Sequence, residues 1–321
     1  MINWGMIGCG DVTEVKSGPA FNIAGKSRIY GVVSRTESRA RDYAKRHNIP
    51  NVFSSVSDLI NSLDIDAIYI ATPPASHPVL ALEVAHAKKP CCIEKPIANS
   101  YPEAVQITEA FKANNTPLFV AYYRRTLPRF LAVQSWILDG KIGNIRHVHW
   151  SLTQQPTSED LEKQYSWRID PNYAQGGYFD DLACHGLDLL DLFLGPITQA
   201  KGISVNQQQI YDVPDSVSAT WLHEGNVTGS AYWNFCGSET SDEVVIIGEK
   251  GRIAFSVFDD KNPQCEVEGD VLSVDIAHPK HVQKPHVETM VEHLLGNVVY
   301  SSTGESATRT AWVCDKILSK L

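Results

Sequence analysis

Residues 1–121 alternate short apolar runs with amphipathic stretches. The runs that are apolar at consecutive positions lie at residues 4–8, 29–33, 67–71, 91–93 and 118–121. Between them, the apolar side chains of residues 37–46, 57–61, 78–87 and 102–113 have the spacing typical of helices. Strands that are apolar on both faces and alternate with helices predict a doubly wound parallel sheet with helices on both sides.

The pattern changes after residue 121. Apolar and polar positions alternate at residues 146–150, 216–221, 230–235 and 243–247, and turn signals follow at 224–226 and 249–251. Helices are expected at 129–139, 180–194 and 305–320. We therefore predict an α/β protein in two domains: a parallel-sheet domain over residues 1–121, and an α+β domain with an open, mostly antiparallel sheet over residues 122–321.

Composition and charge narrow the possible functions. The chain has 321 residues, 43% of them hydrophobic and 20% charged, with a net charge of −9, which is typical of a globular protein with a sizeable core. An acidic chain without basic clusters argues against nucleic acid or an anionic membrane as the main partner. The seven cysteines show no CxxC spacing, the chain starts directly in a strand, and no apolar run is long enough to span a membrane. We expect a cytoplasmic protein.

A glycine-rich turn follows the first apolar run. The sequence GMIGCGDVT places Gly8 and Gly10 where a Rossmann fold binds a dinucleotide, with Asp11 and Val12 opening the next helix. Gly8 permits a tight turn, and Gly10 lets the backbone approach a pyrophosphate at a helix N-terminus. Thr13 occupies the position of the third glycine of this motif. The sequence favours a dinucleotide site here, and a purely structural turn is the alternative.

The end of the second run indicates which dinucleotide is bound. An NAD site usually has an acidic residue there that accepts a hydrogen bond from the ribose, but this chain has Ser34 and Arg35, followed by Arg39. A hydroxyl and two guanidinium groups suit a 2′-phosphate, so we predict NADP as the cofactor, with NAD as the alternative. The competing interpretation is a helix N-cap with solvated arginines.

Two further turns follow buried runs. In ATPPASH, Thr72 and Pro73 are expected to contact the cofactor, and His77 either contacts it or forms local hydrogen bonds. In IEKP, Glu94 and Lys95 lie at the carboxyl edge of the sheet, where the nicotinamide is expected. An ion pair at a strand end is the alternative interpretation of this pair.

These motifs together resemble the Gfo/Idh/MocA family of oxidoreductases, which includes glucose-fructose oxidoreductase and inositol dehydrogenase. GCGD, ATPPASH, IEKP, WRIDP, GGYFDDLACHGLD, GEKGRIAF and TGESATRTAWV occur in family order along essentially the whole chain. The resemblance implies a Rossmann domain followed by an open-faced α/β domain. It also implies Lys95, Asp181 and His185 as catalytic residues. Ala183 replaces the glycine that the family usually has between the last two, which affects the shape of the pocket more than the chemistry.

The residue pattern of DDLACHGLDLLD agrees with that implication. On a helix over 180–194, Asp181, His185 and Asp188 share one stripe, and leucines cover the other faces. Asp181 can orient and charge-balance the His185 imidazole. Asp180 is expected to cap the first turn, and Asp191 lies off the stripe and needs no function.

The proposed reaction is hydride transfer between a nicotinamide and a secondary alcohol or ketone of a sugar, polyol or related compound. His185 would act as general acid or base, and Lys95 would donate to the same substrate oxygen. Asp181 and His185 would also contact the substrate, and weaker substrate-binding candidates are Tyr123, Arg124, Trp167 and Arg168. A structural role is an equal alternative for these four.

Other functions were weighed against this one. A metal site is not expected, because no three or four ligands converge: His147 and His149 share a strand face, and His281 and His286 are expected in a loop. An NAD-dependent glycoside hydrolase that oxidises its substrate transiently and a non-catalytic dinucleotide-binding regulator are the alternatives. Aromatic residues along the C-terminal strands, together with the family resemblance, predict a homodimer or homotetramer through that sheet.

Overall fold

The computed structural model describes residues 1–164 and 166–321, which divide into two compact units. The first unit contains residues 1–127 and 279–308, and the second contains residues 128–278 and 309–321. Residues 279–308 therefore return to the first unit. The functional division at residue 121 stays a prediction.

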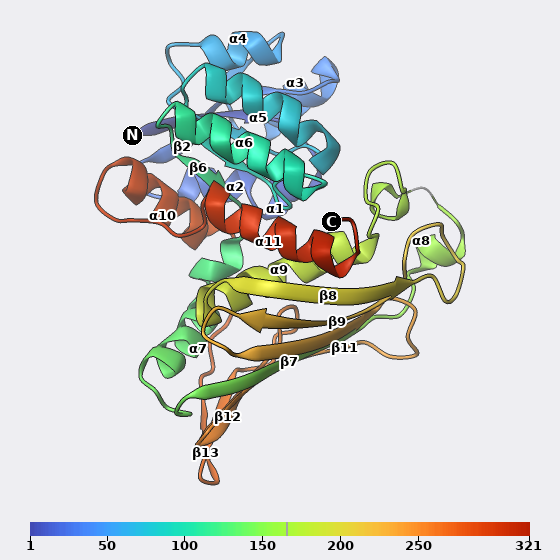
Figure 1. The fold of residues 1–321 in the computed structure, drawn as a ribbon. Coiled ribbons are helices and arrows are strands. Elements are labelled where there is room, and N and C mark those ends of the chain that lie inside the picture. The colour runs from blue at the N-terminus through green and yellow to red at the C-terminus, as the bar shows by residue number, and fades with distance from the viewer. Residues whose placement is uncertain (165) are drawn as a thin grey trace. The chain divides into compact units, whose positions relative to one another are not determined.

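The first unit is built on a six-stranded parallel sheet with the order β3-β2-β1-β4-β5-β6. In Figure 1 this part of the chain is coloured from blue to green. Its strands are β1 Ile2–Ile7, β2 Ser27–Val33, β3 Asn51–Val52, β4 Ala67–Ile70, β5 Cys91–Ile93 and β6 Leu118–Val120. The strand order reverses between β1 and β4, which pair in parallel. Ligands of such sheets bind outside the carboxyl ends of the strands at this reversal, so the turns that follow β1 and β4 are the expected cofactor position.

Helices connect the strands of the first unit. They are α1 Asp11–Val15, α2 Gly18–Ile23, α3 Glu37–Arg46, α4 Val56–Asn61, α5 His77–His86, α6 Tyr101–Ala113 and α10 Lys284–Leu294, with short 3₁₀ turns η1 Pro74–Ser76 and η2 Tyr123–Thr126. The core joins β-strand side chains such as Trp4, Met6 and Tyr69 to Val287 and Met290 of α10. Residues 279–308 are thus packed into the core of the first unit.

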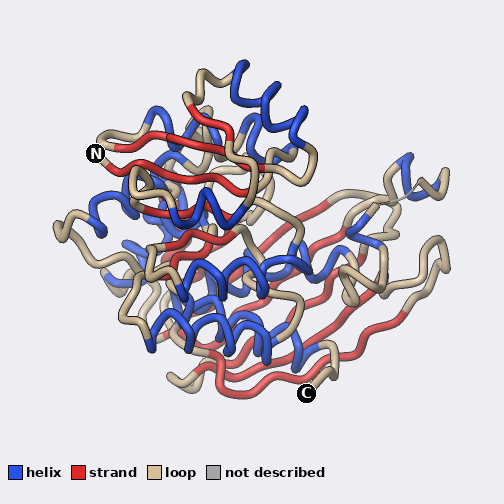
Figure 2. Tube along the Cα trace, turned by 90° about the horizontal axis from the view of Figure 1, so that it is seen from above, coloured by secondary structure: helices blue, strands red, loops and turns tan. Residues whose placement is uncertain are grey.

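The second unit contains an eight-stranded sheet with the order β14-β13-β12-β11-β7-β10-β9-β8. Its strands are β7 Ile145–Thr153, β8 Ile197–Val205, β9 Ser216–His223, β10 Thr228–Asn234, β11 Ser241–Gly248, β12 Gly251–Phe255, β13 Gln264–Val267 and β14 Asp270–Ser273. Only β7 and β10 pair in parallel, and the other pairs are antiparallel. Figure 2 shows these long strands running side by side.

The helices of the second unit are α7 Pro128–Leu138, α8 Ser158–Leu161, η3 Trp167–Ile169, α9 Tyr178–Leu194 and the end of α11 Gly304–Ile317. Helix α9 packs on the inner face of the sheet. The ring of Phe179 meets Trp233 edge-on at 5.0 Å, and Trp233 meets Trp150 at 5.3 Å. Residues 183–191 of α9 are all buried, so the helix is a core element of this unit.

The predicted fold class is confirmed: a doubly wound parallel sheet is followed by a mostly antiparallel sheet with helices. The strands β1, β2, β4, β5 and β6 and the helix α3 lie where the hydrophobic pattern predicted them. Helix α1 begins at Asp11, where a helix was expected after the glycine turn. The elements β3, α2, α8, β8, β12, β13, β14 and α10 were not predicted. His286 was expected in a loop and lies instead in α10, where its side chain is fully buried.

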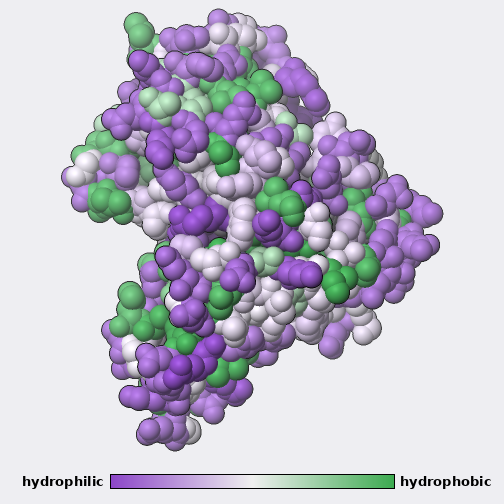
Figure 3. All heavy atoms as spheres, viewed as in Figure 1, coloured by the Kyte–Doolittle hydropathy of each residue, from purple (hydrophilic) through white to green (hydrophobic). Residues whose placement is uncertain are grey.

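Apolar residues on the face of the molecule shown in Figure 3 form small groups among hydrophilic ones. Among the described residues, no helix has both the length and the apolar composition that a membrane span requires.

Candidate active site

The glycine turn after β1 has no room for a side chain at its first position. Gly8 has a φ of +102°, and a Cβ atom on it would lie 2.6 Å from the carbonyl oxygen of Ala71, which follows β4. Its N–H donates to the carbonyl of Val33 at the end of β2, at 2.9 Å. Gly8 therefore lets the ends of three neighbouring strands approach one another, which only glycine allows at this backbone conformation.

The second glycine borders open space. A Cβ on Gly10 would have no heavy atom within 4 Å, and Gly10 is the N-cap of α1 without a side-chain cap. Asp11 and Val12, the next predicted cofactor residues, begin this helix. The turn thus presents backbone N–H groups beside an unfilled volume, an arrangement that fits a pyrophosphate group.

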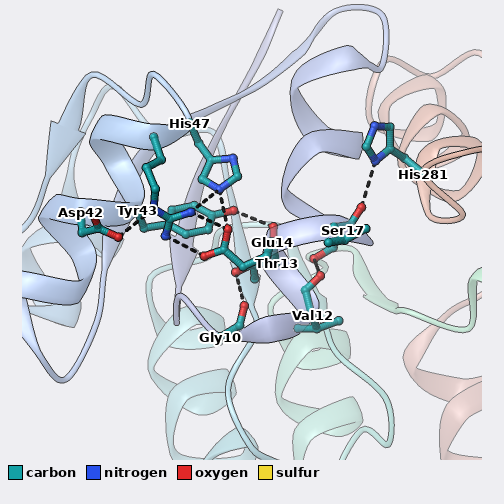
Figure 4. Close-up of polar contacts among 11 residues, drawn as sticks. Gly10, Val12, Thr13, Glu14, Ser17, Asp42, Tyr43, His47 and His281 are labelled. Atoms are coloured by element: carbon teal, nitrogen blue, oxygen red, sulfur yellow. Dashed lines mark hydrogen bonds and ion pairs between the residues drawn. The ribbon is translucent and has the colours of Figure 1, made fainter.

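Thr13 replaces the third glycine of the motif and stabilises the turn directly. Its buried hydroxyl donates to the Gly10 carbonyl at 2.7 Å. Its own carbonyl accepts a 2.7 Å hydrogen bond from the hydroxyl of Tyr43 in α3 (Figure 4). Burial raises the pKa of Tyr43 to about 12, so this hydroxyl remains a donor at neutral pH. The sequence pattern gave no indication of Tyr43, because its position in α3 is set by packing.

A charged cluster connects α1 to the end of α3. The carboxylate of Glu14 accepts two hydrogen bonds from Arg46, both 2.7 Å. It also lies 2.8 Å from His47 Nε2 (Figure 4). The Arg46 hydrogen bonds lower the pKa of Glu14 to about 2. Together with Tyr43, this cluster fixes α3 relative to the glycine turn.

The residues predicted to bind a 2′-phosphate lie near the N-terminus of α3: Ser34 and Arg35 precede the helix, and Arg39 is in its first turn. Ser34 is half-buried, and Arg35 and Arg39 are exposed. Within the described residues neither arginine forms an ion pair, whereas Arg41 pairs with Glu37 and Arg46 with Glu14. Burial raises the pKa of the Cys9 thiol to about 11, and the positive charges of Arg39 and Arg46 act against that rise.

His77 connects the turn after β4 to the loop after β5. Its imidazole is fully buried, with Nε2 2.8 Å from the Thr72 carbonyl oxygen and Nδ1 3.0 Å from the Pro96 carbonyl oxygen. Burial lowers its pKa, which favours the neutral ring. These local hydrogen bonds hold the segment of Thr72 and Pro73 against the segment that follows Lys95.

Glu94 is held in a buried network at the end of β5. Its Oε1 accepts hydrogen bonds from the Tyr69 hydroxyl at 2.6 Å and from Gln283 Nε2 at 2.8 Å. Its Oε2 accepts a 3.3 Å hydrogen bond from the backbone N–H of Lys95. Burial, and secondarily the carboxylate, raises the pKa of Tyr69 well above its usual range. Glu94 therefore fixes the backbone from which the Lys95 side chain extends, and Tyr69 and Gln283 are partners that the sequence did not indicate.

The predicted substrate residues Tyr123 and Arg124 lie in η2. Both are buried; Arg124 Nη1 donates to the Tyr123 hydroxyl at 3.0 Å, and its guanidinium lies 5.0 Å from the centre of that ring. The structure thus brings these two residues together within the first unit.

In the second unit, α9 carries the two remaining catalytic candidates. Arg168 of η3 donates its Nε hydrogen to Asp181 Oδ2 at 2.9 Å and lies over the Trp167 ring at 4.6 Å. The predicted group of Trp167, Arg168 and Asp181 is therefore contiguous. Asp180 was expected to cap the first turn, but the N-cap position of α9 is Gly177 and has no side-chain cap hydrogen bond. Asp180 instead accepts a 2.7 Å hydrogen bond from the backbone N–H of Gly176, just before the helix.

His185 is 5% exposed and lies one turn after Asp181. The ring of Phe258 meets its imidazole edge-on, with 6.0 Å between the ring centres. The next residue, Gly186, packs directly against the indole ring of Trp150 in β7, and any side chain there would clash with that ring. The His185 segment of α9 is therefore seated closely on the sheet.

The last two aspartates of the helix are buried. Asp188 is fully inaccessible. Asp191, to which the sequence assigned no function, accepts two hydrogen bonds from Arg309 of α11, at 2.8 and 2.7 Å. That expectation is therefore corrected: Asp191 attaches α9 to the C-terminal helix, and the helical stripe alone could not reveal a partner 118 residues away.

No group of three or more metal-ligating side chains occurs within residues 1–164 and 166–321. His147 and His149 share one face of β7, as their spacing predicts, and both contact the Ser230 hydroxyl.

Two family models match the chain. Residues 2–122 match the model described as an oxidoreductase family with an NAD-binding Rossmann fold, and residues 130–254 match the GFO/IDH/MocA C-terminal domain.

Several individual proteins are similar to this chain over most of their own length. Oxidoreductase P35 of Formosa agariphila is 35% identical over 98% of this chain and 97% of its own length. D-xylose 1-dehydrogenase [NADP(+)] of Haloarcula marismortui is 25% identical over 85% of this chain and 78% of its own length. Among solved structures, a levoglucosan dehydrogenase in complex with NADH and levoglucosan has a TM-score of 0.88 at 22% identity, covering 99% of this chain and 96% of that one.

Proposed function

Because the chain belongs to the Gfo/Idh/MocA family of NAD(P)-binding oxidoreductases, we propose that it is an NADP-preferring dehydrogenase of a sugar or polyol. The reaction would convert a secondary alcohol and its ketone into one another. The observation that carries the proposal is the open volume beside Gly10, at the turn where the strand order of the parallel sheet reverses.

The residues around this turn fit a dinucleotide. Gly10 borders open space, whereas Gly8 lets the turn pack closely against Ala71. Thr72 and Pro73 follow the neighbouring strand β4. The preference for NADP rests on Arg35 and Arg39, which are exposed, lie beside Ser34 and form no ion pair within the described residues. Two such guanidinium groups can form charge-assisted hydrogen bonds with a 2′-phosphate.

The catalytic roles follow from the chemistry that each side chain can supply. The bound nicotinamide would accept or supply the hydride. The His185 imidazole would take the hydroxyl proton from the substrate during oxidation and return it during reduction. The Lys95 ammonium would donate a hydrogen bond to the same oxygen and stabilise its negative charge. Asp181, held by Arg168, would orient the imidazole or accept a hydrogen bond from a second hydroxyl of the substrate.

The substrate class is taken from relatives. Proteins similar to this chain are named as dehydrogenases of D-xylose and of levoglucosan, which supports a carbohydrate. Trp167, Arg168 and Asp181 form a contiguous aromatic, cationic and anionic group in the second unit, and such a group can bind the faces and hydroxyls of a sugar.

The test is a binding and activity screen. NADPH and NADH are titrated against the protein, and each oxidised cofactor is then assayed with D-xylose, D-glucose, levoglucosan and myo-inositol. The proposal predicts tighter binding of NADPH and cofactor reduction with at least one of these compounds. Glycoside cleavage without added cofactor would favour the hydrolase alternative instead. Dinucleotide binding without any turnover would favour a regulator.

We also propose that the protein forms a homodimer or homotetramer through the outer face of the second sheet. Ile203 of β8 and Tyr232 of β10 are exposed and lie in one row across the sheet, each paired with Ser218 of β9. The nearby Ile247 of β11 is exposed on the same face. Light scattering of the wild type and of Ile203→Lys/Tyr232→Lys tests this; a wild-type monomer would contradict it.

A further inference from the structure

We propose that Asp242, a buried carboxylate in β11, is a positioning residue that holds the His185 imidazole in place through the loop of residues 256–260. The inference rests on the proposed role of His185 as acid and base. Asp242 lies 57 positions beyond His185 in the sequence, and no sequence motif indicated it.

Asp242 accepts hydrogen bonds from three separate groups. Its Oδ1 accepts from Trp150 Nε1 at 2.9 Å. Its Oδ2 accepts from the Ser256 hydroxyl and from the Phe258 backbone N–H, both at 2.6 Å. Asp242 is 2% exposed and forms no ion pair within the described parts of the chain. Its negative charge is therefore compensated by neutral donors, two of which lie on one short loop.

The same loop is held from its other side. Arg129 of α7, which is 2% exposed, donates to the carbonyl oxygens of Asp259 at 2.8 Å and Asp260 at 3.1 Å. Within the loop, the Ser256 hydroxyl accepts a 3.0 Å hydrogen bond from the Asp259 N–H. A loop fixed by buried polar groups at both ends has few alternative conformations.

Two of the residues that donate hydrogen bonds to Asp242 carry aromatic rings that contact the His185 segment of α9. The first is Phe258, whose ring packs edge-on against the His185 imidazole. The second is Trp150, whose indole ring packs directly against Gly186. Asp242 thus fixes one ring against the imidazole and another against the neighbouring backbone. Catalytic geometry is sensitive to displacements of about 1 Å, so these two contacts are expected to matter for rate.

The chemistry of the site requires a carboxylate rather than an amide. A carboxylate offers acceptors on both oxygens, which matches three N–H and O–H donors. An asparagine has almost the same shape but one acceptor oxygen, so its NH₂ group would face Trp150 Nε1 or the pair of donors on the loop. At least one hydrogen bond is then replaced by two opposed donors in a buried site, which is unfavourable.

The experiment compares Asp242→Asn with a matched control. Asp215 is 1% exposed, lies in the same unit and accepts 2.8 Å hydrogen bonds from the N–H groups of Gln207 and Gln208. For Asp242→Asn, Asp215→Asn and the wild type, kcat and KM are measured with NADP and the most rapidly oxidised sugar of the screen, together with the NADPH Kd and the melting temperature. We expect kcat to fall about 10-fold or more in Asp242→Asn, with the NADPH Kd unchanged within about twofold. In Asp215→Asn, kcat stays within about twofold of wild type although its melting temperature also falls.

Ser256→Ala provides a milder variant if Asp242→Asn does not fold. It removes one donor to Asp242 and one acceptor from the loop, and a kcat loss of several-fold is expected. An unchanged kcat in the folded variants, or an equal kcat loss in Asp215→Asn, would overturn the inference.

A spectroscopic readout separates this inference from the proposed function. In protein labelled at histidine ring carbons, the His185 ring resonance is assigned by its loss in His185→Gln. It should shift in Asp242→Asn and Ser256→Ala, because the Phe258 ring moves relative to it, and should not shift in Asp215→Asn. This holds even if the wild type oxidises no sugar. An active wild type whose His185 resonance is the same in all three variants would refute the inference alone.

Discussion

The guanidinium of Arg168 donates a 2.9 Å hydrogen bond to the Asp181 carboxylate while it stacks on the Trp167 ring. The planar group satisfies both contacts at once, which an ammonium group cannot do. Asp181 is therefore held by a residue outside its own helix, and its orientation depends on η3 as well as on α9.

Arg168→Lys is accordingly predicted to weaken substrate binding. The charge remains, but the stacking and the directed hydrogen bond are lost, so KM for the sugar should rise about 3- to 10-fold while the NADPH Kd stays unchanged. Steady-state kinetics measure this. Arg146→Lys is the control, since Arg146 likewise pairs with a carboxylate, that of Glu249, but is exposed on β7. Equal KM values for the wild type and Arg168→Lys would contradict the prediction.

Cofactor preference provides a second prediction. Arg39→Ala should raise the Kd of NADPH about 10-fold or more and leave the Kd of NADH nearly unchanged, because a charge-assisted hydrogen bond contributes about 1.5–3 kcal/mol. Fluorescence titration with both cofactors measures the ratio. Arg41→Ala is the matched control, because Arg41 lies on the same helix but pairs with Glu37. A wild type that prefers NADH would show that the assignment of Ser34 and Arg35 is wrong.

Tyr43 provides a test of the glycine turn. Tyr43→Phe removes the hydroxyl that donates a hydrogen bond to the Thr13 carbonyl oxygen. We expect the free energy of unfolding to fall by about 1 kcal/mol and the NADPH Kd to rise several-fold, with kcat little changed. Tyr30→Phe in β2 is the control, since its hydroxyl forms no hydrogen bond within the described residues. An NADPH Kd equal to that of the wild type would separate Tyr43 from cofactor binding.

The pH dependence of stability should report His286. Burial lowers the pKa of this histidine from 6.5 to about 3. Its ring lies beside the Tyr300 hydroxyl and 3.7 Å from Cys92 Sγ, and it forms no ion pair with any residue that the structure describes. Between these two pKa values the unfolded chain binds a proton at this position and the folded chain does not. Stability is therefore fully present above pH 6.5 and falls as the pH decreases towards about 3.

His286→Gln tests this contribution. Urea unfolding of the variant and the wild type, at several pH values between about 4 and 8, gives the slope of unfolding free energy against pH. At acidic pH the free energy of unfolding of the variant should depend less steeply on pH than that of the wild type. The two slopes should differ by about 1.4 kcal/mol per pH unit, which corresponds to one bound proton. Parallel curves would show that the histidine titrates equally in both states.

The sequence predicted those features that depend on residues close together in the chain. The alternation of apolar runs and helices indicated the parallel sheet, and the strand-glycine-helix order indicated the turn of Gly8 and Gly10. The periodicity of residues 180–194 predicted helix α9 to within two residues at its start. These patterns are local, because they arise from the repeat of a single strand or helix.

Contacts between distant residues could not be predicted in this way. Asp191 and Arg309, Tyr43 and Thr13, and Asp242 and Trp150 each meet because separate elements pack together. The burial of Asp191 follows from a partner that helical periodicity cannot reveal. The same holds for Glu94, whose partners Tyr69 and Gln283 come from another strand and from the segment that returns to the first unit.

The central claim is that His185 transfers the substrate proton during hydride transfer. Its most direct test is the single-turnover rate of NADP reduction by the preferred sugar in the wild type and in His185→Asn, with the NADPH Kd measured in both. A general acid–base catalyst increases the reaction rate by about 10²–10⁴-fold. The rate in His185→Asn should therefore fall by that factor, while the NADPH Kd stays within about twofold of the wild-type value. A variant that reduces NADP at the wild-type rate would contradict the account.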